Sequence, residues 1–179
     1  MKRLGLSVIG VAALVLVAGV WFTSTGQNER RVDMKITSPA FMEGEAIPET
    51  YTCTGRDTNP PLAISGVPAG ARTLALIASD PDALGGTFYH WLIWNLPADV
   101  TELPASWQPP AGTGVGTNGF GKAAYGGPCP PSGIHHYHFT AYALDKSLSI
   151  RDGAGVGALQ AAMSGHIVAQ TEIVGTVSH

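Results

Sequence analysis

Short apolar runs alternate with turn-forming residues through most of the chain, which is typical of β-strands. Six runs are rich in β-branched or aromatic residues, and turn formers bound each of them. These runs are Met34–Thr37, Leu62–Ser65, Thr73–Ser79, Tyr89–Asn95, Tyr137–Leu144 and Ile167–Val174. A single helix is predicted after Asp152, because Val156, Leu159 and Met163 share one helical face. Gly165 is placed to end that helix.

The order of these elements predicts the fold class. Strand follows strand, without the repeated strand and helix alternation of a parallel sheet. We therefore expect a mostly β protein, an antiparallel β-sandwich with one or two short helices. The glycine-rich stretch Gly112–Thr117 lacks a Lys-Ser/Thr pair and a following helix, so we interpret it as a flexible loop and not as a phosphate-binding motif.

The first residues differ in character from the rest of the chain. Lys2 and Arg3 precede an uncharged run over residues 4–22. As a helix, this run is long enough to cross about 30 Å of hydrocarbon. We expect residues 1–24 to act as a signal peptide or an uncleaved membrane anchor. The bulky Trp21 and Phe22 favour the anchor, because signal peptidase requires small residues near its cleavage site.

The basic flank also predicts where the rest of the chain lies. Lys and Arg stay on the cytoplasmic side of a membrane span, so the remainder is expected outside the cytoplasm. We expect an exported protein on the periplasmic or extracellular side, anchored to the inner membrane by residues 4–22. Residues 25–32 form a polar tether in this prediction, and residues 33–179 form the folded domain.

Composition and charge exclude several classes of protein. The 179 residues include 10 Lys and Arg and 13 Asp and Glu, which gives a net charge of -3. A nucleic-acid groove needs clustered basic residues, so no nucleic-acid partner is expected. Only 13% of the residues are charged, while Gly (23) and Pro (13) are frequent, which indicates a compact fold with many loops.

The predicted compartment bears on the oxidation state of the two cysteines. Cys53 and Cys129 form no Cys-x-x-Cys pair, so a zinc site built on thiolates is excluded. Export makes a disulfide between them possible, and it would add on the order of 4 kcal/mol to stability. Two buried thiols that act as small apolar groups are the alternative, and the sequence leaves both open.

The candidate functional residues lie in three segments of the chain. Asp80 and Asp82 follow an apolar strand, with Pro81 between them, which is also the composition of an ordinary turn. A loop position for Asp80 predicts that Asp80→Ala leaves the fold nearly intact. His90 lies in an apolar strand, where a core role is the common one. Residues 135–138 read His-His-Tyr-His, and alternation places the first and third on one face and the other two on the opposite face.

Two chemical alternatives use these residues. Asp80, Asp82, His90 and one histidine of the cluster have the ligand types that zinc or iron accepts, but no metal-binding spacing is present, so no metal is expected. A hydrolase would use an aspartate to orient His90 or His135. Its nucleophile would be one of the serines at 65, 79 and 132, but none of them lies in a Gly-x-Ser-x-Gly elbow.

Taken together, the motifs resemble one known family. The stretches that carry the resemblance are Asp-Pro-Asp-Ala at 80–83, Tyr-His-Trp-Leu-Ile-Trp-Asn-Leu-Pro at 89–97, Gly-Pro-Cys-Pro-Pro-Ser-Gly-Ile-His at 127–135 and Tyr-Ala-Leu-Asp at 142–145. Residues 51–62 and 165–169 add to it. Over about residues 34–177 the chain is similar to the phosphatidylethanolamine-binding protein family, and most of all to its bacterial YbhB/YbcL or Raf-kinase-inhibitor-like branch.

The resemblance implies an antiparallel β-sandwich with a shallow pocket for phosphate, acetate or a phosphoryl head group. The pocket residues that it implies are Asp80, Asp82, His90, Gly127, Pro128, His135 and Tyr137. His136 stands where the family usually has arginine, which replaces a permanent cation by a group that titrates near neutral pH. Alternation places His136 on the strand face opposite His135, so the pocket is expected to persist.

These residues suggest how an anion would be held. We expect N–H groups of the Gly126-Gly127 turn, the two imidazoles and the Tyr137 hydroxyl to donate to it, while each aspartate accepts a bond from one imidazole. The expected function is non-enzymatic binding of a small anion without a cofactor, with membrane contact through the amino-terminal segment. The alternatives are an inhibitor or regulator of a protease or kinase partner, and a hydrolase that uses the same pocket.

Overall fold

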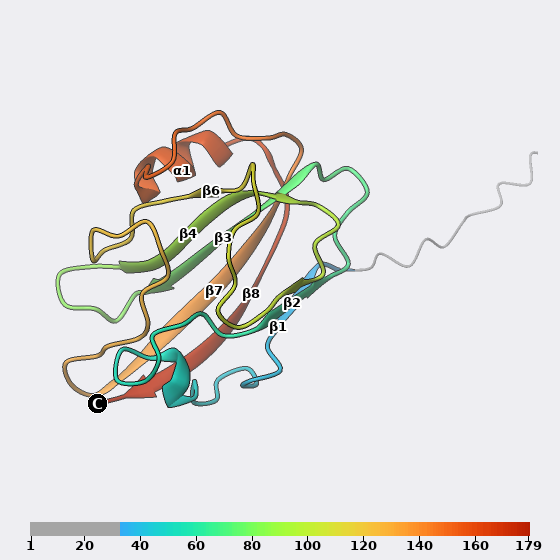
Figure 1. Ribbon diagram of the computed structural model, residues 1–179. Coiled ribbons are helices and arrows are strands. Elements are labelled where there is room, and N and C mark those ends of the chain that lie inside the picture. Colours follow the sequence, from blue (N-terminus) through green and yellow to red (C-terminus); the bar gives the residue numbers. More distant parts are fainter. Residues whose placement is uncertain (1–32) are drawn as a thin grey trace, which may run out of the picture. The chain divides into compact units, whose positions relative to one another are not determined.

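The computed structural model describes residues 33–179 (Figure 1). The predicted signal peptide or anchor and the polar tether, residues 1–32, lie outside the described residues. Within residues 33–179, no helix has both the length and the apolar character that a membrane span needs.

Two antiparallel sheets make up most of the fold. The smaller sheet has the order β1-β2-β5, and the larger one has the order β6-β4-β3-β7-β8. The strands are β1 (Lys35–Thr37), β2 (Leu62–Ser65), β3 (Thr73–Asp80), β4 (Phe88–Pro97), β5 (Glu102–Leu103), β6 (Gly114–Val115), β7 (Ile134–Leu144) and β8 (Ile167–Ser178). One α-helix, α1 (Val156–Met163), and one 3-10 helix, η1 (Glu49–Tyr51), accompany them. The prediction of a mostly β, antiparallel fold is confirmed.

Several of the predicted elements agree with the structure. Strand β2 and helix α1 occur where they are predicted, and Gly165 follows the helix with φ +77°. The predicted flexible loop at 112–117 is wrong in part, because Gly114 and Val115 form β6 and pair with β4. Gly114 lies flat against the Trp94 indole, where a Cβ atom would overlap the ring.

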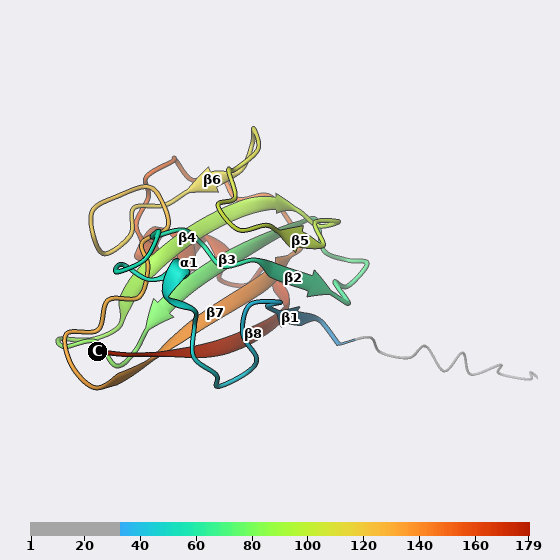
Figure 2. The same cartoon turned by 60° about the horizontal axis from the view of Figure 1, so that its bottom comes forward.

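Both faces of the larger sheet are buried. Leu74 and Leu76 of β3 belong to a core cluster that includes Ile36 and Leu62 of the smaller sheet. The alternate residues Ala75 and Ile77 belong to a second cluster, which includes Leu159 and Met163 of α1. The smaller sheet and α1 therefore cover opposite faces of the larger sheet, as Figure 2 shows.

The edge strand β8 is covered along part of its length. The N–H of Gly44 donates to Val174 O, and that of Ile47 donates to Thr176 O, each at 2.8 Å. Thr176 N–H returns a bond of 2.8 Å to Glu45 O, so residues 44–47 run beside β8 as an extra segment. This pairing satisfies backbone groups that a free sheet edge would expose.

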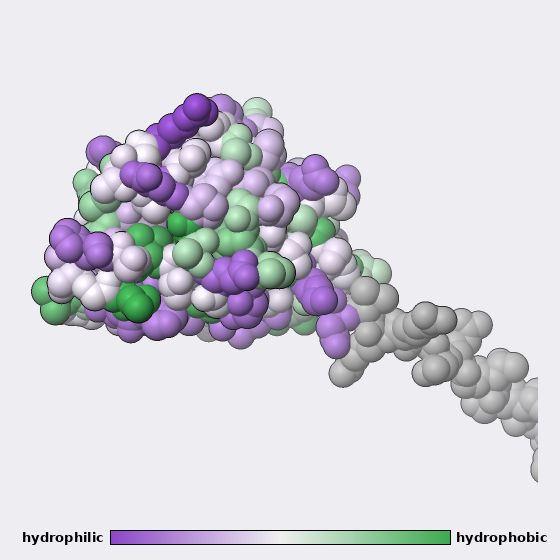
Figure 3. Space-filling model, turned by 90° about the horizontal axis from the view of Figure 1, so that it is seen from below, coloured by the Kyte–Doolittle hydropathy of each residue, from purple (hydrophilic) through white to green (hydrophobic). Residues whose placement is uncertain are grey.

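Large apolar side chains are also found on the surface. Among the described residues, those with substantial exposure are Met42, Leu84, Phe120, Ile134, Ile167 and Val168. Apolar patches among polar residues are visible in Figure 3 on the face that is seen from below. Leu84 and Phe120 are of interest because both line the candidate site described in the next section.

Gly114→Ala is expected to destabilise the protein by about 2 kcal/mol, because the added methyl group forces the buried Trp94 out of its place. Gly157→Ala is the matched control, since Gly157 lies in α1 with open space around its Cα atom. Alanine there should raise stability by roughly 0.5 kcal/mol, because it reduces the conformational freedom of the unfolded chain. Urea denaturation of both variants measures the difference, and equal stabilities would contradict the packing argument.

Candidate functional site

A cavity of about 220 Å³ lies where the end of β3 meets the beginnings of β4 and β7. Four of the predicted site residues line it: Asp80 at the end of β3, His90 in β4, and His135 and Tyr137 in β7. The complete lining is Asp80, Ala83, Leu84, Phe88, His90, Phe120, Cys129, Pro131, His135 and Tyr137. Antiparallel pairing brings these distant parts of the chain to one end of the sheet.

Asp80 holds His135 and the turn that follows β3. Its Oδ2 lies 2.7 Å from His135 Nδ1, and its Oδ1 accepts the backbone N–H of Asp82 at 2.9 Å. Asp80 is 3% exposed and His135 is 7% exposed, so the pair is shielded from water. The predicted loop position of Asp80 is wrong, because Asp80 is the last residue of β3. Both carboxylate oxygens are engaged within the protein, which makes Asp80 a positioning residue.

His90 is oriented by the backbone and not by an aspartate. Its Nδ1 lies 2.7 Å from the carbonyl oxygen of Gly126. The rings of Phe88, Phe120 and Tyr137 surround it, with centroids at 5.0, 5.7 and 5.3 Å from its own. Burial lowers the pKa of His90, although the Gly126 carbonyl and the charge of Asp80 oppose this shift. The neutral imidazole is therefore favoured at this position.

The Tyr137 hydroxyl is a buried polar group without a partner. Tyr137 is 2% exposed, and its Oη makes no hydrogen bond of good geometry to any of the described residues, although the Cys129 backbone and the Asp80 carboxylate lie near it. Burial raises the pKa of Tyr137, and the nearby charge of Asp80 raises it further, so the hydroxyl keeps its proton. Its ring stacks on His135, with an interplanar angle of 23°. A donor of this kind beside two imidazoles is suited to hold a polar ligand atom.

Asp82 lies outside the cavity and binds a different histidine. Its Oδ2 accepts the backbone N–H of His136 at 2.9 Å and contacts His136 Nδ1 at 2.7 Å. These bonds lower the pKa of Asp82. The prediction that each aspartate serves one pocket imidazole is therefore correct for Asp80 and wrong for Asp82. The predicted alternation in β7 is confirmed, because His135 and Tyr137 are buried while His136 is exposed.

The glycine turn at 126 and 127 offers no free donors to an anion. Gly126 N–H donates to His90 O at 3.0 Å, and Gly127 N–H donates to Asp57 Oδ1 at 2.6 Å. The predicted anion contacts of this turn are therefore wrong. A Cβ on Gly127 would lie 2.7 Å from Tyr51 O, so glycine is needed there for close packing between two loops.

Pro128 lies on a second and larger cavity. This cavity, of about 760 Å³, is bordered by the segment after η1, by residues 128–131 and by the end of β8. It contains none of Asp80, His90, His135 and Tyr137, although Cys129 and Pro131 border both cavities. Four of the predicted site residues therefore line the smaller cavity and not the larger one.

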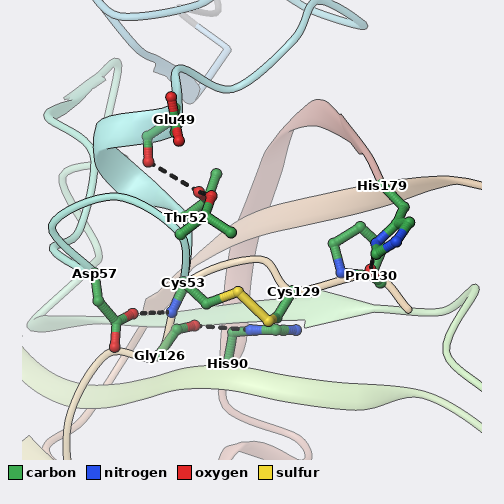
Figure 4. The surroundings of a disulfide bond; sticks show 11 residues. Glu49, Thr52, Cys53, Asp57, His90, Gly126, Cys129, Pro130 and His179 are labelled. Carbon is green, nitrogen blue, oxygen red and sulfur yellow. Dashed lines mark hydrogen bonds between the residues drawn. A yellow bond between two sulfur atoms is a disulfide. The ribbon is translucent and has the colours of Figure 1, made fainter. Parts of the chain in front are cut away.

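A disulfide joins Cys53 and Cys129 beside the candidate site. Figure 4 shows His90 and its hydrogen bond to Gly126 next to this bond. Cys53 N–H also donates to Pro128 O at 3.0 Å, and this backbone bond holds the same two loops together. Of the two alternatives that the sequence leaves open, a bridge or two thiols, the structure has the bridge.

Comparison with known proteins places the chain in a family. Residues 37–178 match the sequence profile described as Phosphatidylethanolamine-binding protein. The chain belongs to this family. UPF0098 protein PH1269 of Pyrococcus horikoshii is 44% identical over 158 residues, which cover 84% of this chain and 79% of that protein. The UPF0098 protein of Methanothermobacter thermautotrophicus is 42% identical over 146 residues, which cover 79% of this chain and 97% of that protein.

Solved structures of phosphatidylethanolamine-binding protein homologues share the fold. CT736 of Chlamydia trachomatis superimposes with a TM-score of 0.79 at 40% identity, and the match covers 83% of this chain and 99% of CT736. YbcL of E. coli superimposes with a TM-score of 0.77 at 31% identity, with 82% and 99% covered. The family resemblance that the sequence motifs predict is confirmed.

Several residues that shape the site of this family member are not predicted from the sequence. Phe120 lines the cavity from a loop that Asn118 organises: the Asn118 Oδ1 accepts the N–H groups of Phe120 and Lys122, each at 3.0 Å. The Asn118-Gly119 pair is a turn signal, but it does not reveal which cavity the next side chain enters. Asp57, with φ +53°, holds Gly127 from 70 residues away, and no local pattern indicates this contact.

The chemical groups of the cavity limit the alternatives for this phosphatidylethanolamine-binding protein homologue. Within residues 33–179, no three His, Cys, Asp or Glu side chains are grouped so that they could hold a metal ion. None of Ser65, Ser79 and Ser132 lines the cavity, and its one cysteine, Cys129, is in the disulfide. The polar side chains that line the cavity are those of Asp80, His90, His135 and Tyr137.

Proposed function

We propose that this protein is a non-enzymatic binding protein whose cavity takes a phosphate, a phosphoryl head group or a carboxylate. The observation that carries the proposal is that His90, His135 and Tyr137 line one cavity, with the Tyr137 hydroxyl buried and without a hydrogen-bond partner. A buried hydroxyl that lacks a hydrogen bond costs about 1–3 kcal/mol. A ligand oxygen that accepts from Tyr137 would remove this cost, which favours binding.

The surroundings support a preformed site. Asp80 fixes His135 at 2.7 Å, and the Gly126 carbonyl fixes His90 at 2.7 Å, so neither imidazole has to be reoriented when a ligand enters. Preorganisation of this kind raises affinity because less conformational freedom is lost on binding. The core that the two sheets share supports the sandwich arrangement within the same proposal.

The proposal includes an exported location. The uncharged run at residues 4–22 and the basic residues before it support an anchor or a signal peptide. The Cys53–Cys129 disulfide supports an oxidising compartment, since such bonds are rare in reducing cytosol. Fractionation of cells that produce the full chain tests this part, and recovery of the protein with reduced cysteines in the cytosol would contradict it.

Tyr137→Phe is expected to weaken binding of inorganic phosphate by roughly tenfold or more, because a hydrogen bond to a charged group contributes about 1.5–3 kcal/mol. The same variant should be as stable as the wild type or about 1 kcal/mol more stable, since it removes the unpartnered hydroxyl. Isothermal titration calorimetry near pH 6 and urea denaturation measure the two effects.

Tyr142→Phe is the matched control for this experiment. Tyr142 lies in the same strand, β7, but packs on the opposite face of the sheet against the α1 cluster. Its variant should bind phosphate as the wild type does. If phosphate bound the Tyr137→Phe and Tyr142→Phe variants equally well, the cavity would not be the binding site.

A further inference from the structure

A third cavity, of about 300 Å³, lies beside β4 and has aromatic walls. Three aromatic side chains line it: Trp91 of β4, Trp107 from the loop between β5 and β6, and Tyr125 from the loop between β6 and β7. None of its lining residues lines either of the two cavities described above. A cavity of this size suits a small molecule and is too small for a polymer.

The three aromatic rings are arranged as a cage. The planes of Trp91 and Trp107 meet at 71° with their centroids 6.0 Å apart, and those of Trp91 and Tyr125 meet at 85° with their centroids 5.6 Å apart. The faces of aromatic rings carry partial negative charge. Walls of this kind attract organic cations, and quaternary ammonium groups are recognised in aromatic cages.

The charge at the cavity is negative. Among the described residues, Asp57 is the one charged residue that lines it, while the neighbouring Arg56 and Lys122 do not. The Asp57 Oδ1 accepts the N–H of Gly127, and no hydrogen bond to its Oδ2 is found within residues 33–179. Burial raises the pKa of Tyr125, and the charge of Asp57 raises it further, so this charge acts on the aromatic wall. A cation is therefore favoured and an anion is disfavoured.

The walls of the cavity are held in place by buried hydrogen bonds. The Tyr125 hydroxyl donates to Tyr51 O at 2.9 Å. Asn59 is 3% exposed, and its Oδ1 accepts the backbone N–H of Trp107 at 2.9 Å while its Nδ2 donates to Pro104 O at 2.9 Å. The loop that carries Trp107 is thus fixed on both sides of the ring. A preorganised cage loses little conformational freedom when a ligand enters.

The backbone around the cavity is strained at two positions. Asp57 has φ +53° and Ser106 has φ +56°, and both residues line the cavity. Within residues 33–179, Asn95 is the one other non-glycine residue with a positive φ. Backbone of this kind is unfavourable for residues with side chains and concentrates at ligand sites. This observation supports a site independently of the aromatic rings.

We propose that the cavity formed by Asp57, Trp91, Trp107 and Tyr125 is a second binding site, which takes a small organic cation with a methylated ammonium group. The methyl groups pack against the aromatic rings, and the Asp57 carboxylate balances the positive charge. A bare metal ion does not fit, because a single carboxylate supplies too few ligand oxygens for it. The site goes beyond the proposed function, since it shares no residue with the cavity of His90 and Tyr137.

Calorimetric titration of the full chain tests this inference. The probes are tetramethylammonium, choline, phosphocholine and the neutral alcohol in which carbon replaces the nitrogen of choline. Both free cations should bind, and the neutral alcohol should bind at least about tenfold more weakly, because it has the same shape without the charge. Phosphocholine should displace choline poorly, since its phosphate would lie near Asp57 without a cation to balance it.

Two variants separate the charge from the aromatic wall. Asp57→Asn retains an acceptor for the Gly127 N–H and tolerates a positive φ, so the loop should keep its conformation. It removes the charge and should weaken choline binding by roughly tenfold. Trp107→Leu removes one aromatic face and should weaken it by a similar factor. Asp99→Asn is the matched control, because Asp99 is exposed and does not line the cavity, and its choline affinity should equal that of the wild type.

The contrary outcomes are equally distinct. Equal affinities for choline and its neutral counterpart would show an apolar pocket without charge recognition and would overturn the inference. An unchanged choline affinity in the Asp57→Asn variant would do the same. Displacement of choline by phosphocholine at lower concentration than by tetramethylammonium would indicate a head group instead of a free cation and would also overturn it. Absence of cation binding would remove the second site and leave the phosphate titration of the proposed function unaffected.

Discussion

Replacing both Cys53 and Cys129 by serine is expected to lower the free energy of unfolding by about 4 kcal/mol. The disulfide joins residues 76 positions apart, so it restricts a large part of the unfolded chain. In the chain-entropy model, the stabilisation grows slowly with the length of the closed loop, and this loop is long. For a domain whose total stability lies in the usual range of about 5–15 kcal/mol, such a loss is large.

Denaturation in guanidinium chloride of the double variant, the oxidised wild type and the wild type in reducing buffer measures this effect. The reduced wild type should match the double variant, because both lack the same cross-link. The pocket should be affected less than the overall stability, since the backbone bond from Cys53 to Pro128 and the Asp57–Gly127 contact still connect the two loops. A loss below 1 kcal/mol would show that the unfolded chain is restricted by something other than the bond.

The sequence predicts the long elements of the fold because their patterns are repeated over many residues. Strand β3, predicted at Thr73–Ser79 and observed at Thr73–Asp80, and helix α1 each extend over eight residues and are bounded by turn formers. Strands β5 and β6 are two residues long and contain no repeat to detect. Their formation depends on partners such as Trp94 of β4, which pairs with Gly114. Tertiary contacts of this kind are not encoded in local periodicity.

The site is predictable to the extent that strand geometry alone places its residues. Alternation in β7 separates His135 from His136, and the structure has this arrangement. Which acceptor each imidazole meets is a different question. The partner of His90 is a backbone carbonyl 36 residues away, and the partner of Asp82 is His136 on the outer face. Neither pairing follows from residue types, since any of the histidines could have met either carboxylate.

Asp80→Ala is expected to destabilise the protein by about 3 kcal/mol, contrary to the small effect that a loop position predicts. The carboxylate of Asp80 accepts from the buried His135 Nδ1 and from the partly buried Asp82 backbone N–H, and alanine leaves the buried His135 donor without its acceptor. Each buried donor that loses its acceptor costs about 1–3 kcal/mol. Thermal and urea denaturation measure the change, and a loss below 1 kcal/mol would mean that water replaces the carboxylate.

Asp80→Asn changes the chemistry of the pocket with a smaller loss of stability. The Asp82 backbone N–H can only donate, so the amide oxygen of asparagine must face it. The amide NH2 group then faces His135 Nδ1, which has to become an acceptor, and the hydrogen of the ring moves to Nε2. His135 then has its N–H group on Nε2 and no longer donates from Nδ1.

This exchange predicts a change in anion affinity. The Asp80→Asn variant should bind inorganic phosphate more tightly than the wild type does at pH 7, because the variant removes a negative charge beside the cavity. Nitrogen chemical shifts of the His135 ring report the tautomer directly. Asp82→Asn is the matched control, because its partner His136 lies outside the cavity and the smaller change in affinity is expected there. Equal phosphate affinities of the Asp80→Asn variant and the wild type would show that the charge of Asp80 does not act on the ligand.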